Sequence, residues 1–281
     1  MKFSCDKYVL QQAAASAARA AAAKSPIPTL EGLLIEAGAS VRITGYDLKK
    51  AIYTTIDADI PEPGSVLIGA RLFCEMLRRM PDGIVTVEAE NGTVSVKCGK
   101  AAFNLVGLSA DDYPDLPTVE AENGVSLPQD LLKKMINECS FAVSTNESRP
   151  VYMGTLFEIE NNVLTMVSVD GYRLALRREA VEGYGDDCSF IVPGTALSDL
   201  ERLCGDSDER VVLSVGSKHI SFTVGNTVIL SRRLEGDFLN YKKAIPESFR
   251  VTVKTARTDL LEVLNPNNLA FSLRRRRIVA I

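Results

Sequence analysis

The sequence has no tryptophan and a single histidine, His219, among its 281 residues. Its six cysteines are scattered along the chain, and no two of them form a Cys-x-x-Cys pair. Because zinc sites need closely spaced Cys or His ligands, the spacing argues against a zinc site. Isolated cysteines within alternating apolar segments are typical of reduced core residues, which points to a reducing, cytoplasmic compartment.

Long apolar runs and an excess of positive charge are also missing. No stretch of about 18 apolar residues occurs, which argues against a membrane-spanning helix, and the N-terminus MKFSCDKYVL does not resemble a signal peptide. The net charge is −4 and the pI about 5.3. This charge disfavours a protein that binds nucleic acid by bulk charge, but it permits one whose cations gather on a single surface.

Enzyme signatures are absent as well. No P-loop, GxSxG, HExxH or GxGxxG motif occurs, and one histidine leaves general acid–base work to carboxylates in no recognisable pair. Asp111, Asp112 and Asp115 form an acidic loop that would suit Mg²⁺, but its later counterpart GDFLNY lacks most of the acids. A repeated structural loop explains both segments better than a catalytic metal site does.

What the sequence does contain is an internal repeat. A helix predicted over Asp6 to Lys24, rich in alanine, is followed by strands, a helix over about Ala70 to Arg79 and three more strands. The same order returns about 125 residues later, with helices over about Gln129 to Phe141 and Thr195 to Cys204. Alternating strands joined by short turns predict antiparallel sheets, and two helices per unit would cover one sheet face. The fold class expected is α+β.

A third unit begins after Ile245. Residues Arg250 to Lys254 read as a strand and Thr258 to Leu264 as a helix start, which matches the entry into the second unit. Only 36 residues follow Ile245, so we expect this unit to be truncated. The run Arg274 to Arg277 has no counterpart; it is either a basic tail for nucleic acid or the edge of a truncated or frame-shifted reading, and the second interpretation is favoured.

Several segments resemble one family in their order and separation. These segments are MKFSCDKYVLQQA, LEGLLIEA with TGYDL, DDYPDLP, GTLFE with SVDGYRLAL, and LEGDFLNY with AIP. Over about residues 1 to 260, they are similar to the bacterial DNA polymerase III beta subunit, the sliding clamp. The resemblance implies a DNA clamp fold of repeated domains, each with two helices packed on antiparallel sheet. Domain I would cover residues 1–120, domain II 125–245, and the start of a truncated domain III 246–281.

The resemblance also implies a function and partners. The family is a processivity factor that tethers the replicative DNA polymerase III to duplex DNA during chromosome replication, with no catalytic residue and no cofactor. Two protomers form a homodimeric ring around DNA without sequence preference, and the DNA polymerase III alpha subunit, the clamp loader and other proteins with a clamp-binding motif dock on it. The ring interface uses the third domain. A truncated, monomeric clamp-like module that binds partner peptides without encircling DNA is therefore the alternative.

Candidate DNA contacts follow from the helices and the loops after them. A ring that holds DNA by enclosure needs only weak phosphate contacts from Lys and Arg. The predicted helical segments are net positive in the first unit, as a DNA-facing surface requires. The second unit can form such a surface only if its acids point away from the central hole of the ring. Solvated charges near helix ends are the competing interpretation. The candidate DNA-binding residues are Lys24 and Arg149, placed by the resemblance, and Arg19, Arg71, Arg78, Arg79, Lys133 and Lys134.

The resemblance places a second site, a groove for partner peptides. An apolar pocket with a few polar groups on its rim suits a short motif with Leu or aromatic anchors. Leu239 departs from the Pro common at that position in the family, and Val169 and Leu174 are alternatively strand core residues. The candidate groove residues are Tyr152, Val169, Gly171, Tyr172, Arg173, Leu174, Leu239, Lys243 and Ala244.

Overall fold

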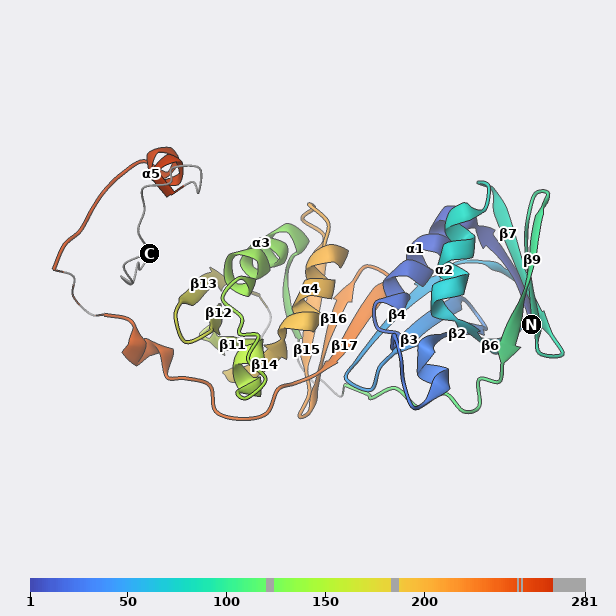
Figure 1. Ribbon diagram of the computed structural model, residues 1–281, viewed down its shortest axis with the longest axis horizontal. Coiled ribbons are helices and arrows are strands. Elements are labelled where there is room, and N and C mark those ends of the chain that lie inside the picture. Colours follow the sequence, from blue (N-terminus) through green and yellow to red (C-terminus); the bar gives the residue numbers. More distant parts are fainter. Residues whose placement is uncertain (120–123, 183–186, 247, 249, 265–281) are drawn as a thin grey trace.

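The structure, a computed structural model, describes residues 1–119, 124–182, 187–246, 248 and 250–264. Two α+β units follow one another along its long axis (Figure 1). Antiparallel strands and two helices per unit confirm the predicted fold class. The first unit contains β1 (Lys2–Asp6), α1 (Lys7–Ala18), the 3₁₀ helix η1 (Pro28–Glu31), β2 (Gly32–Ala37), β3 (Val41–Tyr46), β4 (Lys50–Ile56), β5 (Asp59–Glu62), β6 (Gly64–Gly69), α2 (Ala70–Arg79), β7 (Ile84–Glu90), β8 (Thr93–Cys98) and β9 (Ala101–Leu108).

The second unit repeats this order, and a short segment follows it. Among the described residues, the counterpart of β5 is an isolated antiparallel bridge between Glu182 and Ser126. The elements are β10 (Gly124–Pro128), α3 (Gln129–Ser140), η2 (Pro150–Met153), β11 (Gly154–Glu160), β12 (Val163–Val169), β13 (Leu174–Ala180), β14 (Cys188–Pro193), α4 (Gly194–Leu203), β15 (Arg210–Val215), β16 (His219–Val224), β17 (Thr227–Arg232), η3 (Tyr241–Ala244) and α5 (Arg257–Leu264).

Helix α1 is shorter than the sequence predicts. The residues before it form β1, in which Phe3 and Cys5 alternate into the core while the backbone pairs with β7. Asp6 then caps the helix, because its Oδ1 accepts hydrogen bonds from the backbone N–H of Tyr8 (2.8 Å) and Val9 (3.3 Å). The helix ends at Ala18 despite the alanines that follow. The predicted start at Asp6 is therefore confirmed to within one residue, whereas the predicted end at Lys24 was wrong.

One sheet continues from the first unit into the second. Strand β4 pairs with β17 in antiparallel register from Thr54–Thr227 to Lys50–Ser231, so the two units share a 13-stranded sheet. A buried hydrogen bond of 2.9 Å joins the hydroxyls of Thr54 and Thr227 within this joint. The core is shared as well, since Ile52 from the first unit packs in the hydrophobic cluster of the second.

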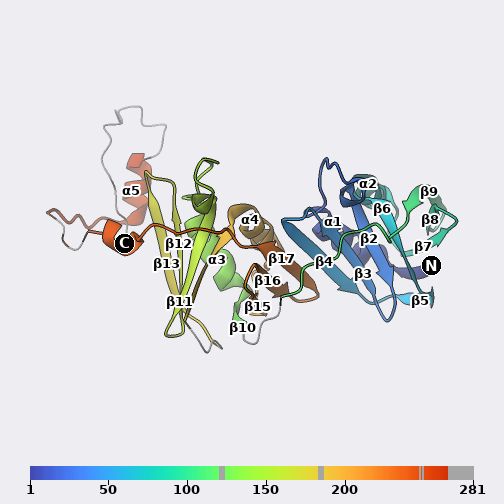
Figure 2. The same cartoon turned by 90° about the horizontal axis from the view of Figure 1, so that it is seen from below.

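In the first unit, α1 and α2 pack on this continuous sheet. In the second unit, α3 and α4 contact both this sheet and a separate four-stranded sheet of order β13-β12-β11-β14 (Figures 1 and 2). In the first unit, α1 lies very close to the sheet: a Cβ added to Gly45 on β3 would sit 2.0 Å from the carbonyl oxygen of Ala17. In the second unit the helices rest on larger side chains, including a stack of Phe157 on Phe190 with ring centroids 5.5 Å apart.

The linker between the units runs along the opposite face of the sheet (Figure 2). Tyr113 is buried there and clusters with Tyr46, and Leu116 and Val119 pack against the same cluster. Burial raises the pKa of the Tyr113 phenol above its ordinary value. The DDYPDLP loop is thus a structural element that holds the linker onto both units, as a repeated structural loop requires.

The predicted strand over Arg250 to Lys254 was wrong. Val251 and Val253 are 77% and 78% exposed, and the segment forms no strand. An alternating apolar pattern becomes a strand only where a sheet edge pairs with it and covers one face. The helix start at Thr258 is confirmed by α5, whereas Arg274 to Arg277 lie outside the described residues.

Candidate nucleic-acid interface and partner groove

Each of the four long helices buries one side, α1 and α2 against the continuous sheet and α3 and α4 against both sheets of the second unit, and exposes the other side. Helix α1 packs beside α2, and α3 beside α4. Arg71, Arg78 and Arg79 are exposed on α2, and Lys134 is exposed on α3. Their side chains therefore point away from the sheet, on the side of the molecule that carries all four long helices of the two units (Figure 1).

The candidate cations divide into paired and unpaired groups. Lys133 donates to Asp206 at 2.7 Å, a hydrogen bond that raises the pKa of this lysine. Arg78 lies 3.9 Å from Glu75 in an exposed pair, which is a weak interaction. Within the described part of the chain, the exposed candidate cations without an ion pair are Arg19, Lys24, Arg71, Arg79, Lys134 and Arg149.

Two lysines at the N-terminus, before and at the start of the first helix, are paired with acids. Lys2 lies on β1, 3.6 Å from Glu88, and the largely buried Lys7 lies 3.5 Å from Asp82. The positive charge expected from the N-terminal segment is therefore carried by Arg19 at the C-cap of α1 and by the loop that follows.

Lys24 and Arg149 lie in equivalent loops, each between the first helix of its unit and a 3₁₀ helix that starts with proline. In the first loop, the backbone N–H of Ser25 donates to Glu31 at 2.9 Å. In the second, Oδ1 of Asn146 accepts from the backbone N–H of Ser148 at 3.0 Å. Short local hydrogen bonds thus shape both loops and leave the two cations exposed.

Acids of the second-unit helices are neutralised by partners. Asp199 on α4 is buried and forms an ion pair with Lys50 on β4, across the joint between the units. Glu138 on α3 lies 3.2 Å from Arg177 on β13. The negative charges of the α3 and α4 segments argued against a DNA-facing surface in the second unit. Two of these acids are therefore neutralised by cations on neighbouring strands.

The hairpin between β12 and β13 contains several of the candidate groove residues. Oδ1 of Asp170 accepts from the backbone N–H of Tyr172 (2.9 Å) and Arg173 (3.1 Å), and its Oδ2 accepts from the Arg173 guanidinium at 2.8 Å. Burial alone would raise the pKa of Asp170, but these hydrogen bonds together lower it. Gly171, with φ 91°, permits the turn, and Tyr172 is left 89% exposed.

The segment after β17 packs against the same region and brings the two sets of candidate groove residues together. Its residue Tyr241 is buried with Leu156 and Ile191 in a cluster against which Leu174 packs. Tyr241 also donates its hydroxyl to Glu158, and burial, followed by this contact, raises its pKa. Val169 is buried, whereas Gly171, Tyr172, Arg173, Leu239, Lys243 and Ala244 are exposed and Tyr152 is intermediate.

Residues that the sequence reasoning missed support this groove. Phe238 packs edge-on against Tyr152 with ring centroids 5.6 Å apart, and the Arg173 guanidinium lies 5.5 Å from the ring of Phe141. Phe238 occupies the place of Tyr113 in the repeat, so the pairing of DDYPDLP with GDFLNY held the signal for it.

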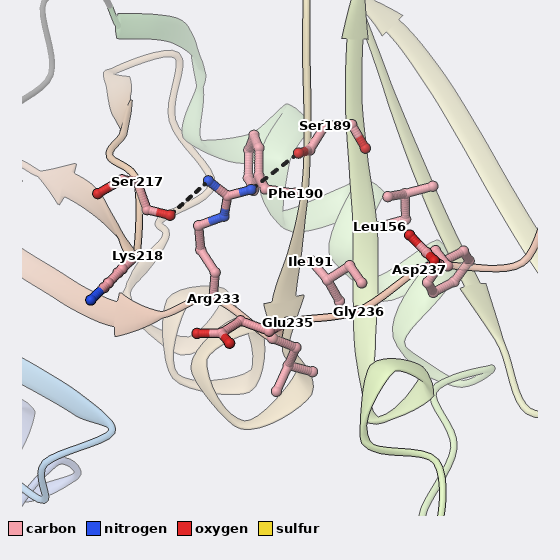
Figure 3. Close-up of a pocket in the computed structure, with 12 residues that line it drawn as sticks. Leu156, Ser189, Phe190, Ile191, Ser217, Lys218, Arg233, Glu235, Gly236 and Asp237 are labelled. Carbon is pink, nitrogen blue, oxygen red and sulfur yellow. Dashed lines mark hydrogen bonds between the residues drawn. The ribbon is translucent and has the colours of Figure 1, made fainter.

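A cleft of about 360 Å³ lies beside Phe238 (Figure 3). Arg233 extends across it and donates to the carbonyl oxygens of Ser189 and Ser217, both at 3.2 Å. Leu156 and Ile191 form its apolar side. Arg233 therefore ties β14 to the β15–β16 turn and is committed to backbone oxygens.

Neither metal nor membrane features occur in the part of the chain that the structure describes. Within the described ranges, no group of three or more His, Cys, Asp or Glu side chains is placed to hold a metal ion. Among the same residues, no helix has the length and apolar character needed to cross a membrane.

Comparisons with known proteins agree on one family. Residues 1–117 match the model of the DNA polymerase III beta subunit, N-terminal domain, and residues 126–240 match that of its central domain. The chain is 30% identical to the beta sliding clamp of Bacillus subtilis, over 100% of this chain and 77% of the relative. It is 31% identical to that of Halalkalibacterium halodurans, over 94% of this chain and 73% of the relative.

Solved structures agree with these relatives. The crystal structure of the DNA polymerase sliding clamp from Bacillus subtilis superposes with a TM-score of 0.92 at 30% identity, over 99% of this chain and 76% of that one. The DNA polymerase III beta chain from Streptococcus pneumoniae gives a TM-score of 0.83 at 29% identity, over 88% and 68%. Two repeated α+β units with their helices on one face belong to the same fold. The chain is therefore a member of the bacterial DNA polymerase III beta subunit family, and its function is that of a DNA sliding clamp, a processivity factor in DNA replication.

Proposed function

We propose that the chain acts in a homodimeric ring that encircles duplex DNA, with the helical side of the sheet facing the nucleic acid. The observation that carries this proposal is the set of unpaired, exposed cations on that side of a protein whose net charge is −4. The domains would be domain I at 1–120 and domain II at 125–245, with residues 246–281 beginning domain III. The monomeric alternative is not favoured by the relatives, which are named beta sliding clamps.

DNA is held by phosphate contacts without sequence preference. Lysine and arginine neutralise phosphates and release counterions, so such contacts weaken as salt rises. Lys24 and Arg149 would reach the backbone from their loops, and Arg19 from the end of α1. Arg71, Arg78, Arg79, Lys133 and Lys134 would line the helical surface, with Lys133 weakened by its bond to Asp206.

The edge of the first unit supports the homodimer. Strand β9 exposes Phe103, Val106 and Leu108, and Leu72 on neighbouring α2 is 59% exposed. In the described part of the chain, β9 pairs with β6 only at Gly107 and Leu108, so its earlier residues pair with β8 on one side alone. An apolar strand with one unpaired side invites pairing with another chain. A second protomer would cover it, and light scattering at micromolar concentration tests this: a strict monomer contradicts the ring.

Partner proteins dock at the groove formed by the β12–β13 hairpin and the segment after β17. Exposed Tyr172 and Leu239 beside the Leu174 cluster suit a short motif with Leu or aromatic anchors. The DNA polymerase III alpha subunit, the clamp loader and other proteins with a clamp-binding motif are the proposed partners. The chain itself would need neither a catalytic group nor a cofactor, and it would work in the cytoplasm.

Loading onto nicked circular DNA with a clamp loader, followed by linearisation, tests the topology. A ring slides off the linear product, whereas a protein held by ordinary contacts stays bound. Lys24→Glu should lower retention on the circle several-fold, since the charge reversal repels phosphate. Lys97→Glu is the matched control, because Lys97 is exposed on β8, away from the helices. Equal effects of the two variants would contradict the proposed lining.

A further inference from the structure

A second cavity, of about 650 Å³, lies where the two units join. Its walls come from the β3–β4 hairpin, from η2, from the start of α4 and from the segment after β17. Pockets that bury a ligand in proteins enclose about 300–1,000 Å³. The cavity therefore has the size of a binding site, and its lining includes neither Gly171 nor Leu239 of the candidate groove.

The cavity combines an apolar floor with a cationic rim. Leu48, Met153 and Leu234 line it together with Pro150 and Pro193. Lys49 is exposed on the rim and has no ion pair among the described residues, and Arg232 makes only an exposed 3.2 Å contact with Glu235.

The other two cations of the lining are committed elsewhere. Lys50 is taken up by the buried carboxylate of Asp199, and Arg233 by the backbone oxygens of Gly216, Ser217 and Ser189.

The lining also contains two carboxylates: Asp47, which accepts from the backbone of its own hairpin, and Glu235, which contacts Arg232. Lys49, without an ion pair among the described residues, and Arg232, in an exposed pair, are the cations that can meet an incoming group.

The hairpin at the mouth of the cavity carries an unusual residue. Asp47 accepts from the backbone N–H of Lys49 (2.9 Å) and Lys50 (2.7 Å), the same arrangement that Asp170 makes in the second unit. The position after the aspartate has positive φ in both hairpins, but the second unit places Gly171 there and the first places Leu48, at φ 70°.

A leucine in the left-handed φ/ψ region has a strained backbone, whereas glycine adopts this conformation without strain. Its side chain gains little from burial, since Leu48 is 47% exposed and borders the cavity. Backbone strain kept at an exposed position on the edge of a pocket is typical of a site where the side chain contacts something else.

We propose that this cavity binds an extended, acidic peptide segment of a partner protein, whose aliphatic or aromatic side chain enters between Leu48, Met153 and Leu234 while its carboxylates meet Lys49 and Arg232. The apolar floor favours an apolar anchor, and the exposed cations on the rim favour acidic residues beside that anchor. This contact does not depend on ring closure or on DNA.

The probe is a pool of fluorescein-labelled hexapeptides, Gly-Glu-X-X-Glu-Gly, in which X is Leu, Ile, Val, Met or Phe. Fluorescence anisotropy of the full chain should show saturable binding, at least about fivefold tighter than for the pool with Gln in place of Glu. Absence of saturable binding up to millimolar protein, or equal binding of the two pools, would overturn the proposal.

Leu48→Gly gives a test that loss of folding cannot mimic. Relief of the strain should raise the melting temperature, while loss of the side chain weakens peptide binding at least about fivefold. Asn91→Gly is the matched control: Asn91 also has positive φ, 50°, in a distant turn, but asparagine tolerates this conformation, so neither the melting temperature nor peptide binding should rise. Lys49→Gln should weaken the acidic pool only, whereas Lys100→Gln should not.

Two further results decide where and what the cavity binds. The double variant Tyr172→Ala/Leu239→Ser should leave binding of the acidic pool unchanged; if it abolishes binding, the peptide occupies the other groove and the proposal fails. If Leu48→Gly and Lys49→Gln instead reduce retention on duplex DNA and leave peptide binding intact, the rim serves nucleic acid and the proposal is likewise wrong.

Discussion

The two units reach the same topology with different side chains. In the first, alanines of α1 let the helix approach β3 so closely that Gly45 admits no side chain. In the second, the equivalent position is Ser168, fully buried, whose hydroxyl bonds with Thr155 at 2.8 Å, and phenylalanines fill the wider gap. The comparison teaches that a repeat conserves the path of the chain while each copy sets its own distance between helix and sheet.

The largest effect is expected where the first unit is tightest. Gly45→Ala places a methyl group 2.0 Å from the Ala17 carbonyl oxygen, so unfolding free energy should fall by about 4–5 kcal/mol. Gly38→Ala is the control, because no atom lies within 4 Å of its added Cβ. Urea denaturation measures both. A small loss for Gly45→Ala would mean that α1 has room to move outward, as α3 does.

The next largest loss of stability is expected in the aromatic core of the second unit. Phe157 is fully buried between Phe190 and Phe222, and Phe157→Ala should cost about 3–4 kcal/mol through lost burial and a cavity. Ile35→Ala, at the equivalent buried position of the first unit, should cost about 2–3 kcal/mol. An equal or larger loss at Ile35 in chemical denaturation would contradict the difference in packing.

The joint between the units should be sensitive to charge. Lys50→Met leaves the buried Asp199 carboxylate without its partner, which should cost about 3 kcal/mol. Adding Asp199→Leu should restore much of that loss, and a double-mutant cycle measures the coupling. Lys49→Met, on the exposed neighbour, should change stability little. Additive losses would show that the two side chains act independently.

The two hairpins provide the smallest effect. Asp170→Asn should cost about 1 kcal/mol at neutral pH, through weaker bonds to the backbone and Arg173. The folded pKa of Asp170 is lowered, so its stabilisation is present above the unfolded value of about 3.9 and is lost as pH falls through the folded pKa. The stability difference between wild type and variant should therefore shrink in acid; a difference independent of pH would contradict this.

Much of the fold follows from local sequence patterns. The elements that could not be predicted are those that depend on pairing with residues distant in the sequence. The repeat, the helices at Ala70 and Gln129 and the strand alternation were predictable, since period and turn residues are local. Strand β1 was hidden, because a short segment beside an alanine-rich run is a strand only when β7 pairs with it. The pairing of β4 with β17 joins residues far apart in sequence and left no local signal.

The candidate site divides in the same way. Exposure of Lys24 and Arg149 follows from their loops, which short polar residues shape. The engagement of Lys133 by Asp206, and of Asp199 by Lys50, is decided by packing between separate elements. Counting charges along a helix gave the sign of a segment, but it did not tell which of its charges remain free to meet a phosphate.

The pairing of β4 with β17 also determines how the molecule curves. A sheet twists by about 20–25° from strand to strand, so the angle between the units is inherited from the backbone ladder and leaves no hinge at the joint. A slip of two residues in this ladder would slide one unit past the other by about 7 Å. The curvature that the chain contributes to a larger assembly therefore depends on the register of the β4–β17 hydrogen bonds. The buried hydrogen bond between Thr54 and Thr227 forms only in the observed register.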